Sequence, residues 1–403
     1  MKCFSFNLCH KAQCQVLAVF ALMLAACATQ ESGNSNPAPA TTTVASAPAA
    51  PTAPAAPPAP ITALPHDEAV LFAARDLFIK AQLPANQKYS VVIDPLVDGV
   101  TGIQSVATAA MEKQVVGLVR SAFPQFEIKP FSAAAVADLP LILIGTFTPI
   151  NLQGKADGER DAYRVCFALA DLKTGKIVSK GFARSQTGGV DSSPMPYFRD
   201  APVWVSDKIV EGYIKTCQGT KAGDPINPAY VDKIVAATTI DEAMRAYNSK
   251  NYKDALALYN AVLRNPAGDQ PRVHAGIYLA NLKMGRRDAA MKSFGKVVQY
   301  GLAGNRLAVK FNFRPAGTGF AADGNPYEQW LKEIARLSAQ QTACVEVAGH
   351  ASRGGSEPIG DKVDAARDYR PERLAGRLHD AHDRNQGAKV AVLGRDRRGL
   401  TVA

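Results

Sequence analysis

The residues of this chain best suited to bind a small charged group lie near its C-terminal end. The run Cys344–His350 predicts a strand that ends in a turn at Gly349 and His350. Arg353 follows this turn, and a planar guanidinium can hold a carboxylate with two hydrogen bonds. A solvated Arg353 is the alternative. Because His350 has no Cys, Ser or metal-ligand partner at a suitable spacing, it favours a structural rather than a catalytic role.

Residues 308–360 resemble the OmpA-like domain, the peptidoglycan-binding module of Gram-negative cell envelopes. That family has a strand, then Gly-His-Thr-Asp, a Gly, an Asn and a helix that opens with Leu-Ser-x-x-Arg-Ala. Gly349, His350 and Gly355 match this pattern. Ser352 stands at the position of the Asp, and Gly360 stands at the position of the Asn. The resemblance implies an α+β domain after about residue 306.

The resemblance also implies which residues hold the ligand. In the family, an Asp and an Arg pair the ammonium and the carboxylate of a diamino acid in the wall peptide. The corresponding peptidoglycan-binding candidates in this chain are Ser352, Arg353 and Arg367. Ser352 does not supply a full negative charge, and Pro371 should interrupt the helix on which Arg367 is expected.

The tail at 361–403 does not have the pattern of a folded half-domain. It is rich in Arg, Asp, His, Gly and Ala and poor in spaced apolar residues. We therefore expect neither the further helix nor the closing strand that the resemblance implies. A shift of reading frame near residues 360–364 would explain this tail, and genuine divergence is the alternative. The coding DNA distinguishes the two, because only a frameshift leaves a Leu-Ser-x-x-Arg-Ala-like stretch in a neighbouring frame.

The N-terminal region has the pattern of an export signal. A basic leader precedes an apolar run at 16–26, which is too short to span a membrane permanently. The run ends in Leu-Ala-Ala-Cys and resembles the bacterial lipoprotein signal, which implies that Cys27 carries the lipid, including palmitate. Ala28 after that cysteine implies sorting to the outer membrane, facing the periplasm. Ordinary secretion is the alternative interpretation.

The remaining cysteines agree with an oxidising compartment. Of the seven cysteines, Cys3, Cys9 and Cys14 belong to the leader. Cys166 and Cys217 lie in one predicted domain and could form a disulfide. Cys344 is then left without a partner, which is the second reason for the frameshift hypothesis.

The chain of 403 residues divides into segments of different composition. After the signal at 1–27, a Pro/Ala-rich tether is expected at 28–64, because such a segment buries no core. Residues 65–220 alternate predicted helices and strands and end in a hairpin, which indicates an α/β domain with a mixed sheet. The elements expected are helices at 69–81 and 107–123, strands at 89–94, 126–131 and 139–147, and hairpin strands at 163–172 and 177–184.

Residues 238–300 resemble tetratricopeptide repeats. Tyr247, the run at 251–255 and Tyr259 match the second half of one repeat, and a similar pattern returns about 35 residues later. The resemblance implies paired helices that serve as a partner-binding groove or as a structural spacer. Beyond them, a strand is expected at 309–313 and a helix at 325–337. The fold class is thus multidomain α/β plus α, with helical repeats and a C-terminal α+β domain.

Composition narrows the function. An apolar fraction of 47% is that of a globular protein. The net charge is +10, but the basic residues do not form a stripe of the kind that binds nucleic acid. We expect no metal, cofactor or catalytic residue, and rank an enzyme third. The first hypothesis is a non-catalytic lipoprotein that links the outer membrane to peptidoglycan. The alternative is an envelope scaffold that recruits a protein partner through the repeats and the α/β domain.

Overall fold

Alternating helices and strands place a six-stranded mixed sheet in the first half of the chain. The computed structural model describes residues 62–84, 86–151, 153–157, 160–312, 314 and 319–341, with the backbone of three further strands at 4–6, 344–350 and 387–393. All of these belong to one compact unit. The strands of the sheet are β2 (Tyr89–Ile93), β3 (Val97–Asp98), β4 (Phe126–Lys129), β5 (Leu141–Ile150), β6 (Ala162–Asp171) and β7 (Lys176–Ser185).

Pairing in this sheet changes from parallel to antiparallel across its width. The strand order is β4-β2-β5-β6-β7, and the short β3 pairs with β5. Strand β2 is parallel to β4 and β5, whereas β5, β6 and β7 are antiparallel. The turn between β6 and β7 is tight because Gly175 adopts a φ of +67° and Asp171 accepts a hydrogen bond from the Lys173 amide. The predicted mixed α/β sheet is confirmed.

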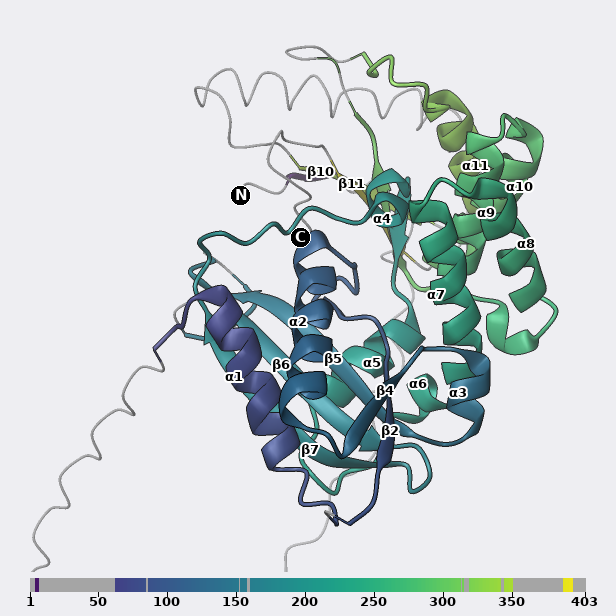
Figure 1. The fold of residues 1–403 in the computed structure, drawn as a ribbon. Coiled ribbons are helices and arrows are strands. Elements are labelled where there is room, and N and C mark those ends of the chain that lie inside the picture. Colours follow the sequence, from purple (N-terminus) through teal and green to yellow (C-terminus); the bar gives the residue numbers. More distant parts are fainter. Residues whose placement is uncertain are drawn as a thin grey trace, which may run out of the picture. The chain divides into compact units, whose positions relative to one another are not determined.

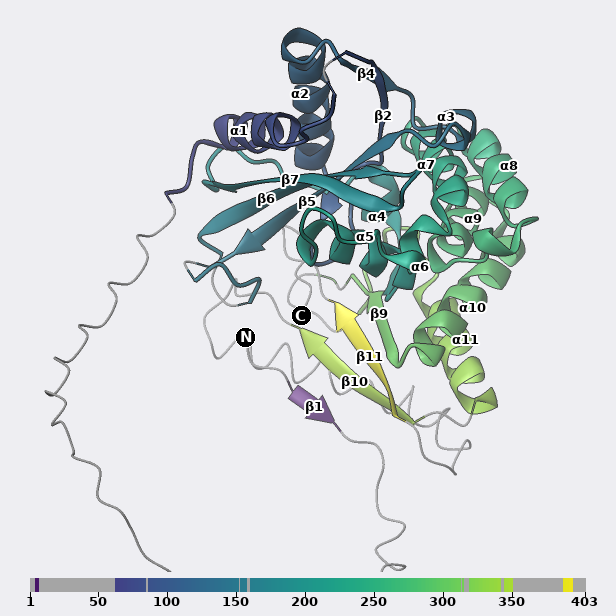
Figure 2. The same ribbon diagram turned by 90° about the horizontal axis from the view of Figure 1, so that it is seen from below.

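Helices cover both faces of the sheet (Figures 1 and 2). One face carries α1 (His66–Ile79) and α2 (Val106–Ala122), and the other carries α5 (Lys208–Gln218) and α6 (Pro228–Val231), with α3 (Ala133–Ala137) beside them. A capping box at Ser105 and Thr108 begins α2. Helix α1 lies so close to β7 that a Cβ on Gly181 would be 1.9 Å from the Ala73 carbonyl oxygen.

Five longer helices follow and pack successively on one another. They are α7 (Ile234–Asn248), α8 (Tyr252–Val262), α9 (Pro271–Lys283), α10 (Arg287–Ala303) and α11 (Tyr327–Gln340). Ala255 and Tyr259 on α8, like Ala290 and Phe294 on α10, are buried one turn apart. Gly276 of α9 faces the Tyr259 ring, where an added Cβ would be 2.2 Å from Cζ. Small residues packed against aromatic rings therefore allow these helices to approach closely.

A second sheet contains β1 (Phe4–Phe6), β8 (Val203–Val205), β9 (Arg306–Lys310), β10 (Cys344–His350) and β11 (Gly387–Leu393). Its order is β1-β10-β11-β9-β8, and β9, β11 and β10 are mutually parallel, as Figure 2 shows. Three expectations are corrected here. The strand expected at 309–313 instead spans Arg306–Lys310, with Leu307 and Val309 fully buried, and the buried Phe311 follows its end.

The other two corrections concern β10 and the tail. Gly349 and His350 lie within β10, opposite Val392 and Leu393, so they belong to a strand and not to a turn. The tail was expected to provide no strand, yet β11 pairs between β9 and β10. The short run at 390–393 consists only of apolar residues, which suits a central strand even though the tail around it is polar.

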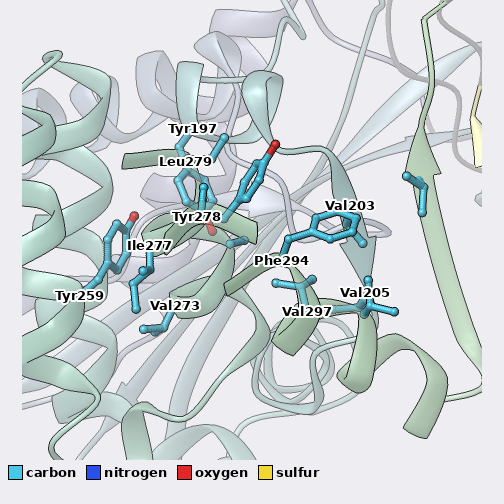
Figure 3. Close-up of a cluster of buried hydrophobic side chains, with 14 of the residues drawn as sticks. Tyr197, Val203, Val205, Tyr259, Val273, Ile277, Tyr278, Leu279, Phe294 and Val297 are labelled. Carbon is cyan, nitrogen blue, oxygen red and sulfur yellow. The ribbon is translucent and has the colours of Figure 1, made fainter. Parts of the chain in front are cut away.

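One hydrophobic core joins the helices to the second sheet. It extends from Tyr197 and β8 through α7–α10 to Leu307 and Trp330, and Figure 3 shows its central part. The residues drawn there with labels are Tyr197, Val203, Val205, Tyr259, Val273, Ile277, Tyr278, Leu279, Phe294 and Val297. No helix in the described part of the chain is both long enough and apolar enough to span a membrane.

Candidate functional site

Most of the residues predicted for wall binding and anchoring lie outside the described residues. These are the lipidation candidate Cys27, the candidates Ser352, Arg353 and Arg367, and the motif residue Gly355. Gly349 and His350 lie in β10. Of the residues predicted for this site, Gly349 and His350 are therefore the two that lie in a described strand.

The structure brings Cys166 and Cys217 side by side, as the predicted disulfide requires, but both are free thiols. Cys166 Sγ donates to the Cys217 carbonyl oxygen at 2.8 Å, and Cys217 Sγ donates to the Cys166 carbonyl oxygen at 3.1 Å. The two thiols therefore make crossed hydrogen bonds in place of the predicted disulfide. Burial raises the pKa of the Cys166 thiol. The buried Lys180 ammonium also donates to the Cys217 carbonyl, and to that of Thr220 at 3.0 Å.

A cavity of about 230 Å³ lies where the first sheet meets the helices. Its lining comes from the loop after β2, from α4 (Pro196–Asp200) and β8, from the start of α5, and from α7, α9 and β9. Sheets with parallel strands bind ligands outside the carboxyl ends of those strands, and this cavity begins at Asp94, directly after β2. The cavity therefore lies where such sheets commonly bind ligands.

The charged residues on one wall of the cavity are Asp207 and Arg272. Asp207 begins α5, where its Oδ1 accepts hydrogen bonds from the amides of Ile209 at 2.9 Å and Val210 at 3.5 Å. Its Oδ2 is buried and accepts no hydrogen bond from any described residue. Arg272 Nε is 3.7 Å from this oxygen, too far for a hydrogen bond, and donates instead to Gln270 Oε1 at 2.8 Å.

Further charged lining residues are Asp94, Glu211, Arg306 and Lys310, of which Asp94 is buried. The Tyr230 hydroxyl donates to Asp94 Oδ2 at 2.6 Å. Burial of the carboxyl, which exceeds the opposing effects of Tyr230 and of the nearby Arg272, raises the pKa of Asp94 to about 7. Asp94 is therefore partly protonated at neutral pH and can donate or accept a hydrogen bond in the cavity.

Two more carboxyls near Asp94 share its environment. Burial and the charge of Asp241 raise the pKa of Glu112 on α2 to about 7. Burial raises the pKa of Asp241 on α7 to about 6, although its ion partner Arg245 is 3.1 Å away. No group of His, Cys, Asp and Glu residues within the described segments has the arrangement of a metal site.

The rest of the cavity is largely apolar and aromatic. Trp204 is fixed because its Nε1 donates to the Thr101 carbonyl oxygen at 3.0 Å, and the Arg306 guanidinium lies 4.9 Å above its ring centre. Further apolar lining residues are Val97, Ile103, Tyr197, Val203, Val205, Ile214, Met244 and Val297. Beside these apolar residues, the described lining offers carboxyl, guanidinium and tyrosine hydroxyl groups.

Tyr197 of α4 packs against one surface of helices α7 and α9. The Tyr197 amide donates to Asn248 Oδ1 at 2.8 Å, and its hydroxyl donates to the Arg272 carbonyl oxygen at 2.5 Å. The Tyr197 ring packs edge-on against Tyr247, 6.1 Å between centres. Tyr197 of α4 thus covers this surface of α7 and α9.

Comparisons with known proteins give no further assignment. No protein-family model, no curated protein and no solved structure matches the chain. The cavity residues were not predicted from the sequence. Asp94 and Pro95, an acidic and helix-breaking pair directly after a buried strand, indicate where that strand ends but do not point to the other cavity residues.

Proposed function

We propose that this chain is a non-catalytic, lipid-anchored protein that links the outer membrane to peptidoglycan. In this proposal Cys27 carries the lipid, the segment after it is a tether, and the segment after β10 contacts the wall. The C-terminal part is proposed to be OmpA-like, and α7–α10 are proposed to be tetratricopeptide-like helix pairs.

The observation that carries the proposal is the parallel arrangement of β9, β11 and β10. Helix α11 connects β9 to β10, which gives the strand–helix–strand order of the resembled domain. The carboxyl ends of parallel strands meet at one edge of a sheet, and ligands bind outside that edge. Ser352 and Arg353 follow the carboxyl end of β10 in the sequence, so this edge is where a wall-peptide site is expected.

The core shared by the helices and β9 supports a mechanical role. Trp330 of α11 donates from its Nε1 to the Tyr278 hydroxyl of α9 at 3.0 Å and stacks on Phe294 of α10. Such packing lets a force applied at α11 pass directly into α9 and α10.

The proposal predicts that Arg367→Ala weakens binding to purified sacculi at least tenfold, because the guanidinium is proposed to pair the wall-peptide carboxylate. The measurement is co-sedimentation of the full chain, made soluble by Cys27→Ser, with sacculi over a range of protein concentrations. Arg384→Ala is the matched control, since it removes the same charge from the same tail. Equal retention of both variants, or no retention of the parent chain, would contradict the proposed function.

A further inference from the structure

We propose that the cavity lined by Asp207 and Arg272 binds a small zwitterion, namely a free α-amino acid with an apolar side chain. This inference is independent of the wall-binding proposal, because it concerns other residues and another ligand. It rests on three observations: incomplete hydrogen bonding by two opposite charges, the size of the cavity, and its apolar lining.

The Asp207 carboxylate has a free acceptor position that a cationic donor could fill. Its side chain is only 10% exposed, and one of its two oxygens has no hydrogen bond within the described structure. A buried, unsatisfied acceptor destabilises the folded state by about 1–3 kcal/mol, and more when it is charged. An ammonium group in the cavity would provide the donor that this oxygen lacks.

The Arg272 guanidinium has donor groups that an anionic acceptor could use. Its Nε is used by Gln270, but its two Nη groups make no hydrogen bond to any described residue. The side chain is 22% exposed and lines the cavity beside Asp207. A ligand carboxylate can accept two hydrogen bonds from this fork. Since Asp207 and Arg272 are neighbours, the ammonium and carboxylate must be close together in the ligand, as they are on one α-carbon.

The size of the cavity selects a small ligand. A volume of about 230 Å³ is below the range of pockets that hold drug-sized molecules. It equals roughly eight water molecules at their share of liquid volume, so it suits a ligand with on the order of ten non-hydrogen atoms. Val203, Val205 and Met244 provide the surface for an aliphatic or aromatic side chain.

The mixture of charges also decides against simpler ligands. The lining carries both signs of charge: Asp94, Asp207 and Glu211 disfavour a purely anionic ligand such as phosphate, and Arg272, Arg306 and Lys310 disfavour a purely cationic amine. Asp94 adds a second acceptor for the ammonium group when it is ionised. A zwitterion is the class of ligand that satisfies both signs of charge in one cavity.

The test is calorimetric titration of the full chain with L-leucine and L-phenylalanine. We expect saturable binding of at least one of them, and binding at least tenfold weaker for leucinamide, which lacks the carboxylate, and for 4-methylpentanoate, which lacks the ammonium. These comparisons use the unaltered protein, so they do not depend on whether a variant folds. No binding at about 10 mM, or equal binding of either analogue, would overturn the proposal.

Variants then locate the site. Asp207→Asn keeps a residue that can begin α5, and Arg272→Gln keeps a polar side chain; each should weaken amino-acid binding at least tenfold. Arg286→Gln is the control, because Arg286 is an exposed cation between α9 and α10 and does not line the cavity. Unchanged affinity in both cavity variants would show that the amino acid binds elsewhere and would overturn the assignment.

Discussion

Replacing Trp330 by alanine is expected to lower the free energy of unfolding by about 3–5 kcal/mol, the usual cost of removing a buried aromatic side chain. Trp330 is 1% exposed, donates to the Tyr278 hydroxyl, and packs edge-on against Tyr327 at 5.0 Å between ring centres. Its stacked neighbour, Phe294 of α10, lies 5.7 Å away. The substitution would therefore leave a cavity among α9, α10 and α11 and remove a buried hydrogen bond.

Urea denaturation of the variant and its parent measures this loss. Trp330→Phe is the control, because it keeps an aromatic ring and should cost about 1–2 kcal/mol for the lost hydrogen bond and volume. Both substitutions should affect one transition that includes the helices and β9, since these elements share a core. A loss below about 1 kcal/mol for Trp330→Ala, or a separate transition for α11, would show that this core is not shared.

The stability of the chain should fall as the pH rises from about 4 to about 7, because of Asp94. Its pKa is raised from 3.8 to about 7, so between these values the unfolded chain releases a proton that the folded chain keeps. The stabilising effect of the protonated carboxyl is complete below the lower value and is lost as the pH passes the higher one. A shift of this size corresponds to roughly 4 kcal/mol for an uncoupled group.

Asp94→Asn removes the contribution of Asp94, since an amide keeps an acceptor for Tyr230 and does not ionise, whereas Glu112 and Asp241, whose pKa values are also raised, titrate in both proteins. We expect the variant to lose clearly less stability than its parent between pH 5 and pH 8, measured by urea denaturation. The difference between the two proteins cancels the opposite contribution of His66, whose pKa is lowered by burial. Asp288→Asn, at an exposed carboxyl, is the control. Parallel pH dependences for parent and Asp94→Asn would refute the assignment.

Long periodic elements were predictable from the sequence, because their apolar spacing is set by the face that they bury. The helix expected at 107–123 is α2, and the helix expected at 325–337 is α11, shifted by two to three residues. The hairpin at 163–184 is β6 and β7, with its turn held by Gly175. Short elements such as β8 and α4 were not expected, because three to five residues carry no usable period.

Boundaries between modules were less predictable than elements. Tyr230, Ile234 and Ala237 pack in the core of the first sheet, beyond the expected end of that domain at residue 220. The expected division between 300 and 306 falls within the core that contains Leu302 and Leu307. Composition changes along a chain show where linkers can occur, but they do not show which surfaces then pack together.

The cavity could not be predicted, because its charged residues come from distant parts of the sequence. Asp94, Asp207 and Arg272 lie on three separate elements, and only tertiary packing places them around one space. Nor does the pattern around Arg272 differ from that of any exposed helix start. The candidates that the sequence predicted instead, at and after β10, are close together in the chain, so a local pattern was enough to select them.

The central claim, a lipid at one end of the chain and a grip on peptidoglycan at the other, is tested most directly in cells. Cells fed an alkyne-tagged palmitate would be lysed, and their sacculi isolated under native conditions with the outer membrane attached. We predict that the labelled chain is found in this fraction. A double variant, in which Cys27→Ser removes the lipid site and Arg367→Ala removes the wall contact, is predicted to be absent from it. After detergent has extracted the membrane, muramidase is predicted to release the parent chain from the sacculi. An unlabelled chain in the soluble periplasmic fraction would contradict the account.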